Sequence, residues 1–132
     1  MKEVVNNKRT VLVVEDEPAI AKVCVRILAA EGFDVEIAIN GQIALNRLST
    51  NVYDFCLVDI RTPEMNGVEL YKRLKDDCPE MANRVIFSTG DVISDDIRAF
   101  LEGTGRPFLA KPFTPDELRS IFRVALAAST SR

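Results

Sequence analysis

Five residues with charged or reactive side chains stand where short apolar runs of the chain end. Three are carboxylates, one is a hydroxyl and one is an amine: Glu15, Asp16, Asp59, Thr89 and Lys111. Crowded carboxylates repel one another unless a cation shares them, and their oxygens favour Mg²⁺, Mn²⁺ or Ca²⁺ over Zn²⁺. Mg²⁺ in proteins commonly binds phosphate oxygens as well. The set therefore predicts a site for a phosphoryl group, with Lys111 and Thr89 around its oxygens.

The sequence contains no histidine at all. This excludes a Ser-His-Asp triad, a histidine-ligated metal and a histidine proton shuttle. It also contains no phosphate-binding glycine loop of the Walker or dinucleotide type, which argues against nucleotide binding. The chemistry that remains is attack of a carboxylate on phosphorus. Asp59 is the candidate nucleophile because it is the lone acid at the end of a central apolar run.

Short apolar runs of this kind are typical of strands buried on both faces of a parallel sheet. The predicted strands span residues 11–14, 35–39, 53–58, 85–87 and 107–110. Helical patterns follow each of them, so five strands alternate with five helices. This alternation predicts an α/β fold with a doubly wound five-stranded parallel sheet. In such sheets ligands bind at the carboxyl ends of the strands, which is where the five reactive residues stand.

Helix boundaries are marked by capping residues, proline and glycine. The predicted start signals are Pro18, Ser94 and a capping box of Thr114 and Glu117, and the predicted stop signals are Gly32, Gly103 and Gly105. Asn40-Gly41 is predicted to turn the chain before the second helix.

The length of 132 residues suits one domain, predicted at 11–128, with flexible tails at 1–10 and 129–132. The net charge of −3 without a basic stripe argues against direct binding of nucleic acid. No apolar run approaches the roughly 18 residues of a membrane span, so membrane insertion is not expected. Three cysteines without a CxxC pair fit reduced thiols, and a cytoplasmic location is predicted.

Four segments resemble the receiver domains of two-component response regulators. They are Val13–Pro18, Asp59–Gly67, Ser88–Gly90 and Lys111–Phe113. The resemblance implies a flavodoxin-like or CheY-like (βα)5 sheet of strand order 2-1-3-4-5. The segment Arg106–Phe113 is also similar to receivers attached to hybrid sensor histidine kinases.

The resemblance assigns a role to each reactive residue. It implies that Asp59 is the phosphoacceptor. It implies that Mg²⁺ (or Mn²⁺) is held by Glu15, Asp16, Asp59 and the backbone carbonyl of Arg61. Glu15 stands where Asp is frequent in the family, a change that preserves the charge.

The resemblance also implies how the phosphoryl group is read. Thr89 would bind a phosphoryl oxygen, and the side chain of Lys111 would pair with the phosphoryl group. The peptide bond between Lys111 and Pro112 would be cis. Thr89 and Phe108 would be the switch residues. Tyr is common at the latter position, and Phe lacks the hydroxyl, so its switching would depend on packing. Arg61 and Asp91 are hypothesised to flank the site and to slow hydrolysis.

The predicted function is transfer of a phosphoryl group to Asp59 from a histidine kinase or a histidine phosphotransfer protein. The chain would assist its own phosphorylation and dephosphorylation without being an enzyme such as a kinase. The predicted output face, formed by the fourth helix, fifth strand and fifth helix, is also a candidate homodimer interface. The alternative is a dimerisation or scaffold module that works without phosphorylation. A haloacid-dehalogenase-type phosphatase would need a second acidic residue two positions after the nucleophile, and this chain has Arg61 there.

Overall fold

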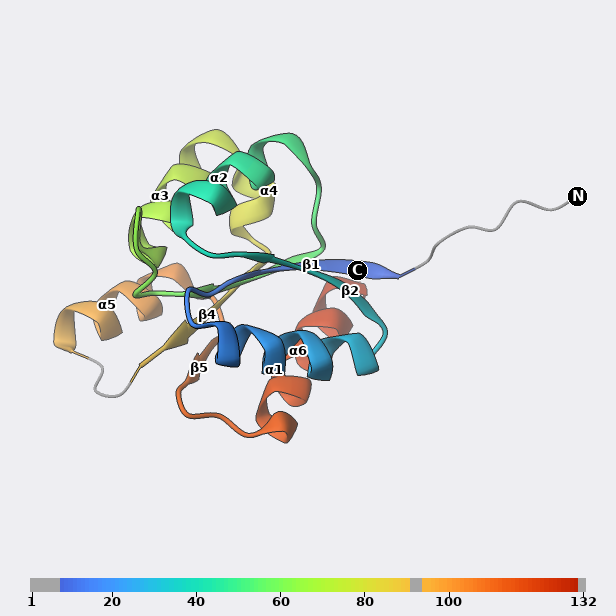
Figure 1. Ribbon diagram of the computed structural model, residues 1–132. Coiled ribbons are helices and arrows are strands. Elements are labelled where there is room, and N and C mark those ends of the chain that lie inside the picture. Colours follow the sequence, from blue (N-terminus) through green and yellow to red (C-terminus); the bar gives the residue numbers. More distant parts are fainter. Residues whose placement is uncertain (1–7, 91–93, 131–132) are drawn as a thin grey trace, which may run out of the picture.

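Five parallel strands form a single sheet in the computed structural model, which describes residues 8–90 and 94–130. In chain order they are β1 (Arg9–Val14), β2 (Phe33–Ala38), β3 (Phe55–Asp59), β4 (Val85–Thr89) and β5 (Phe108–Ala110). Their order across the sheet is β2-β1-β3-β4-β5, which confirms the predicted topology (Figure 1). Every residue of β3 and β4 is buried, as expected for central strands with helices on both faces.

The helices that follow the strands include one that the sequence pattern did not predict. They are α1 (Pro18–Ala30), α2 (Gly41–Thr50), α3 (Gly67–Asp77), α4 (Pro79–Ala82), α5 (Asp95–Thr104) and α6 (Pro115–Thr130). The extra helix is α4, a single turn after α3. Four residues are too few to show an apolar period, and only Pro79 at its first position marks it. The fourth and fifth helices predicted from the sequence are therefore α5 and α6.

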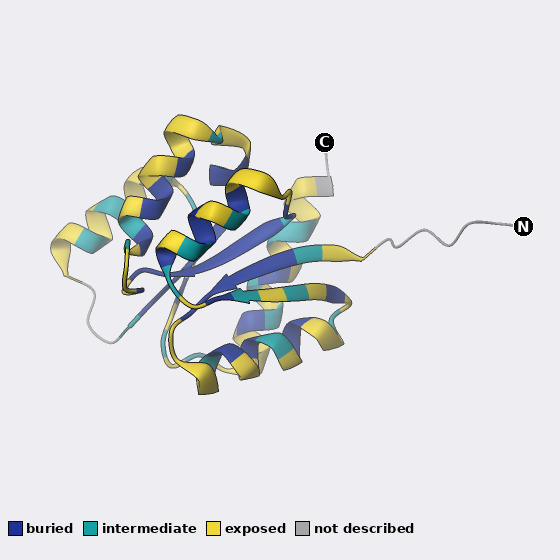
Figure 2. Cartoon of the chain, turned by 45° about the horizontal axis from the view of Figure 1, so that its top comes forward, coloured by how far each residue is buried: buried dark blue, intermediate teal, exposed yellow. Residues whose placement is uncertain are grey.

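Helices lie on both faces of the sheet, and Figure 2 shows that the sheet and the helix sides facing it are buried. The residues buried between them form two apolar layers. On one face, the side chains of Val58 and Phe87 pack with those of α2, α3, α4 and α5. On the other face, Val13 and Leu57 pack with α1 and α6, and Phe122 of α6 makes edge-to-face ring contacts with aromatic residues of β2 and β3. Cys24 and Cys56 are buried in these layers. The core thus holds the carboxyl ends of β1, β3 and β4 in fixed register.

Most of the predicted helix boundaries are confirmed. The Ser94 side chain caps α5, and Thr114 and Glu117 exchange the two hydrogen bonds of a capping box at the start of α6. Gly32, with a φ of +96°, follows the end of α1. These positions could be predicted because each cap depends on residues close together in the sequence.

One boundary prediction was incomplete and one was wrong. The chain bends at Asn40 before the second helix, as predicted, but Asn40 is also the N-cap of α2, where its side chain accepts a hydrogen bond from Ile43 N at 2.8 Å. Gly103 does not end α5, because the helix continues to Thr104 and ends at Gly105, whose φ is +67°. A glycine inside a helix is tolerated when its φ and ψ stay helical, so composition alone does not decide the end.

The elements extend slightly beyond the domain limits that the sequence suggested. Strand β1 already begins at Arg9, which pairs with Phe33, and α6 continues to Thr130. The boundaries 11–128 remain a prediction. Within residues 8–90 and 94–130, no helix is both long enough and apolar enough to span a bilayer.

We expect Phe122→Ala to lower the free energy of unfolding by about 3–5 kcal/mol, because Phe122 is only 1% exposed and contacts two other rings. Val124→Ala is the matched control on the same helix, since Val124 is 69% exposed and its truncation should change stability by less than about 0.5 kcal/mol. Urea denaturation followed by circular dichroism measures both. Equal losses in the two variants would contradict the packing described for this face.

Candidate functional site

The predicted carboxylates meet at the carboxyl ends of two adjacent strands. Glu15 directly follows β1, and Asp59 is the last residue of β3, the neighbouring strand. One carboxylate oxygen from each of Glu15, Asp16 and Asp59 lies within 4.8 Å of the others. Glu15 and Asp59 are buried, whereas Asp16 is exposed. The structure therefore brings together the three acidic residues that the sequence placed at strand ends.

Lys111 reaches these carboxylates from the far end of the chain. Its Nζ donates to Glu15 Oε1 at 2.7 Å and to Asp59 Oδ2 at 2.9 Å. Its backbone N–H donates to the carbonyl of Thr89 at 2.7 Å, which fixes the chain after β5 beside β4. The peptide bond between Lys111 and Pro112 is cis, as the resemblance implied.

Partial burial and hydrogen bonding shift the pKa of two of these groups, Lys111 and Glu15. Burial lowers the pKa of Lys111, but its hydrogen bonds to Glu15 and Asp59 outweigh this effect and hold the pKa above its ordinary value. Burial raises the pKa of Glu15, and the hydrogen bond from Lys111 opposes that shift only in part. Lys111 is therefore a permanently charged partner for the carboxylates at neutral pH.

The four charged groups suit a small divalent cation. Three carboxylates and one ammonium group leave an excess of negative charge at this edge. The donors are all oxygens, and the chain has no histidine, so the site favours Mg²⁺ or Mn²⁺ over zinc. Burial raises the pKa of the Cys24 thiol to about 11, so this thiol is protonated at neutral pH.

Two further predicted residues lie beside the carboxylates. Thr89 is buried at the end of β4 and follows Ser88, which pairs with Asp59 across the sheet. The backbone N–H of Arg61 donates to Asp59 Oδ1 at 3.1 Å, and the guanidinium lies about 3.5 Å from the position that a Cβ on Gly90 would take. Asp91, the hypothesised partner of Arg61, lies outside the described residues.

The predicted switch residue Phe108 lies farther along the sheet. It is the first residue of β5, pairs with Phe87 of β4 and is 39% exposed. Its side chain therefore lies partly at the surface and not in the core. The switching role itself remains a prediction.

Comparison with known proteins identifies the family. The Response regulator receiver domain family matches residues 11–123, most of the chain. The chain belongs to the response regulator receiver domains. It is thus a receiver module of two-component signalling.

Several relatives share this receiver domain. Over 119 residues, this chain is 32% identical to the transcriptional regulatory protein DltR of Streptococcus agalactiae. The matched residues cover 90% of this chain and 52% of that protein. The receiver thus spans about half the length of this curated relative.

Solved structures agree with the fold. A CheY-like receiver from Methanospirillum hungatei is 28% identical with a TM-score of 0.82, covering 96% of this chain and 100% of that one. The receiver domain of a histidine kinase from Syntrophus aciditrophicus is 28% identical with a TM-score of 0.83, covering 94% of each chain.

One residue that positions this receiver's site was not predicted from the sequence. Gly41, at the start of α2, donates its N–H to the carbonyl of Pro63 at 3.2 Å, and a Cβ there would overlap the carbonyl oxygen of Met65. The loop between β3 and α3 also contains two non-glycine residues with positive φ, Glu64 at 57° and Met65 at 99°. The tip of α2 thus holds the loop that leaves Asp59. The Asn40-Gly41 pair was visible, but its contact lies more than 20 residues away in the sequence.

We expect Gly41→Ala to lower the free energy of unfolding by about 1–3 kcal/mol and to displace the loop after Asp59, because the added methyl has no space. Urea denaturation measures the first effect, and backbone amide shifts of residues 60–66 measure the second. Gly103→Ala is the control, since a Cβ there meets nothing within 4 Å and should stabilise α5 by about 0.5–1 kcal/mol. Unchanged amide shifts in Gly41→Ala would contradict the contact.

Proposed function

We propose that Asp59 of this receiver domain accepts a phosphoryl group from a phosphohistidine of a partner protein. The observation that carries the proposal is the cluster of Glu15, Asp16 and Asp59 oxygens within 4.8 Å, with Lys111 bound to two of these carboxylates. The donor must supply the histidine, because this chain has none. A histidine kinase or a histidine phosphotransfer protein would fill that role.

In the proposed reaction an Asp59 carboxylate oxygen bonds to phosphorus while the phosphorus–nitrogen bond of the donor breaks. The bonding pair stays on the imidazole nitrogen, and the product on Asp59 is an acyl phosphate. Bound Mg²⁺, held by Glu15, Asp16, Asp59 and the Arg61 carbonyl, would neutralise charge on the transferred group. Lys111 adds a further positive charge, and the Arg61 N–H orients the carboxylate.

The same residues would carry the signal. Phosphorylation adds close to two negative charges at this edge, toward which Lys111 and the Thr89 hydroxyl would move. Both residues adjoin β5, since the Lys111 N–H is bonded to the Thr89 carbonyl. The output would then be a population shift of the face formed by α5, β5 and α6, with Phe108 repacking on it. That face is also where we place a homodimer contact.

The remaining parts of the proposal concern the setting of the domain. Its net charge of −3 supports a receiver domain that does not bind nucleic acid directly. Three free cysteines support a reducing, cytoplasmic compartment. Assisting its own phosphorylation and hydrolysis would be its only chemistry, so we do not class it as an enzyme acting on other molecules.

Incubation with acetyl phosphate and Mg²⁺ should convert the wild-type chain to a form heavier by one phosphoryl group, measured by intact-protein mass spectrometry. Asp59→Asn should abolish the added mass, because the amide cannot attack phosphorus. Omitting Mg²⁺ should lower the yield at least tenfold.

Asp34→Asn is the matched control, since Asp34 is exposed on β2 and should leave phosphorylation unchanged. Added mass on Asp59→Asn would disprove the assignment of the acceptor. A wild-type chain that takes up no phosphoryl group, from acetyl phosphate or from a phosphohistidine donor, would favour the dimerisation or scaffold function instead.

Arg61→Ala should raise the rate of dephosphorylation several-fold, because the guanidinium lies beside Gly90 at the mouth of the site and would hinder an attacking water. Asp91→Ala should do the same if the two side chains pair across the site. Loss of the phosphorylated form over time after removal of the donor measures the rate. Rates equal to wild type in both variants would refute this modulating role, while Asp59 would still be the acceptor.

A further inference from the structure

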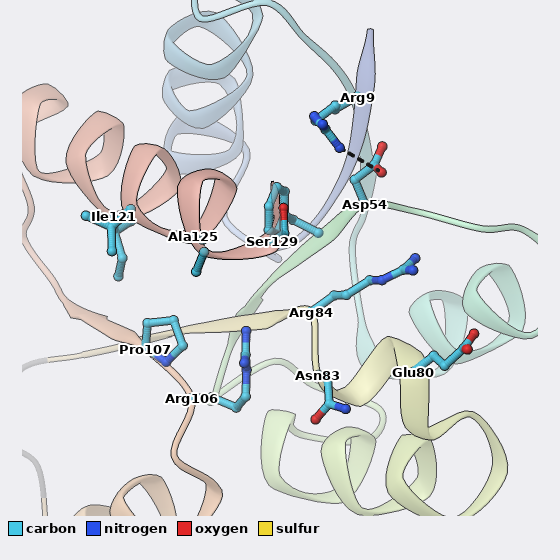
Figure 3. Close-up of a pocket in the computed structure, with 13 residues that line it drawn as sticks. Arg9, Asp54, Glu80, Asn83, Arg84, Arg106, Pro107, Ile121, Ala125 and Ser129 are labelled. Carbon is cyan, nitrogen blue, oxygen red and sulfur yellow. Dashed lines mark ion pairs between the residues drawn. The ribbon is translucent and has the colours of Figure 1, made fainter. Parts of the chain in front are cut away.

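A second polar site lies at the opposite edge of the sheet from Asp59. A cavity of about 770 Å³ opens where the strands begin, between α4, α6 and the amino ends of β1, β3, β4 and β5 (Figure 3). Its volume is in the range of small-molecule sites, which is about 300–1,000 Å³. None of its lining residues takes part in the proposed phosphoryl transfer.

Two half-buried arginines form the polar wall of this cavity. Arg84 Nη1 donates to the carbonyl of Tyr53 at 2.9 Å, and Arg106 Nε donates to the carbonyl of Val85 at 2.9 Å. Within residues 8–90 and 94–130, neither guanidinium has a carboxylate at ion-pair distance. Each arginine is therefore held in place by one neutral carbonyl and keeps other N–H groups for a further acceptor.

The acids near the cavity do not neutralise this pair. Asp54 already accepts from the Thr10 N–H at 2.8 Å and forms an ion pair with Arg9 at 3.8 Å. Glu80 is exposed at the rim and makes no ion pair in the described part of the chain. Burial also lowers the pKa of Arg106, which reflects the cost of a partly desolvated cation without a counterion. An anion in the cavity would relieve that cost.

The wall across from the arginines is mostly apolar. Ile121 and Ala125 of α6 lie on it together with Ser129, and Figure 3 shows α6 on the other side of the cavity from Arg84 and Arg106. Phe55 and Val124 also line the cavity. Val124 is 69% exposed, so this wall is not covered by the domain itself. A ligand that fits both walls has an anionic group on one side and a compact apolar body on the other.

We propose that this cavity binds a small organic anion, a carboxylate or a phosphate monoester on a ring-sized apolar group, between the guanidinium groups of Arg84 and Arg106 and the apolar face of α6. The anion would bond to both arginines in the charge-assisted geometry that planar guanidinium groups provide. Because α6 also forms one side of the output face, such a ligand would contact the helix that the phosphoryl switch is proposed to act on. The binding itself does not depend on that switch.

Titration of the ¹⁵N-labelled chain with benzoate and with phenyl phosphate, in buffer free of divalent metal, tests the proposal. We expect saturable amide shifts at Phe55, Arg84 and Ala125 and none at Asp59 or Thr89. Acetate, which lacks the apolar body, should bind at least tenfold more weakly, and sodium chloride at matched ionic strength should give no saturable shift. A response to only one of the two aromatic anions would support the site and identify its anionic group.

Arg106→Met should weaken binding of the responding anion at least tenfold, because a charge-assisted hydrogen bond contributes about 1.5–3 kcal/mol. Arg73→Met is the matched control, an exposed arginine of α3 far from the cavity lining, and should bind like wild type. Arg84→Met provides the same test if thermal denaturation shows that Arg106→Met is unfolded. Shifts that grow linearly with salt, or wild-type affinity in the folded arginine variants, would overturn the proposal.

Discussion

An ammonium group held between two buried carboxylates is the contact on which the acidic edge of this domain depends. Lys111 binds Glu15 and Asp59 at 2.7 and 2.9 Å, and it compensates charges that would otherwise be costly to bury. The contact joins the ends of β1, β3 and β5. A fold that misplaced any of these strands would leave a buried charge without a partner. The same ion pairs fix the position of the Asp59 carboxylate at the end of β3.

The parallel sheet separates two kinds of chemistry in space. All strands point the same way, so their carboxyl ends gather the acids and Lys111, while their amino ends gather Arg9, Arg84 and Arg106. Helix α6 runs beside the sheet and lines the arginine cavity with its later turns, while its start follows Lys111 by only a few residues. A shift of the chain at the acidic edge and binding of a ligand in the cavity would therefore both affect α6.

The sequence predicted an element correctly where its apolar residues form a regular pattern or where its contacts join residues close together in the chain. Apolar runs predicted all five strands, and the capping pair of Thr114 and Glu117 marked α6 because its hydrogen bonds join residues three apart. It failed at α4, which is too short for a period, and at Gly103, which lies inside α5 instead of ending it. Both errors are ambiguities of short segments, and neither altered the topology.

The residue types and their positions after apolar runs determined, from the sequence alone, that three carboxylates, Thr89 and Lys111 would face one edge of a parallel sheet. Only the tertiary structure decided how they meet: the bonds of Lys111 to Glu15 and Asp59, the Arg61 N–H on Asp59, and the space that Gly41 leaves for Met65. The arginine cavity likewise had no sequence signal, since its residues come from five separate stretches of the chain. Such contacts depend on strand register and helix placement, which side-chain pattern does not encode at ångström scale.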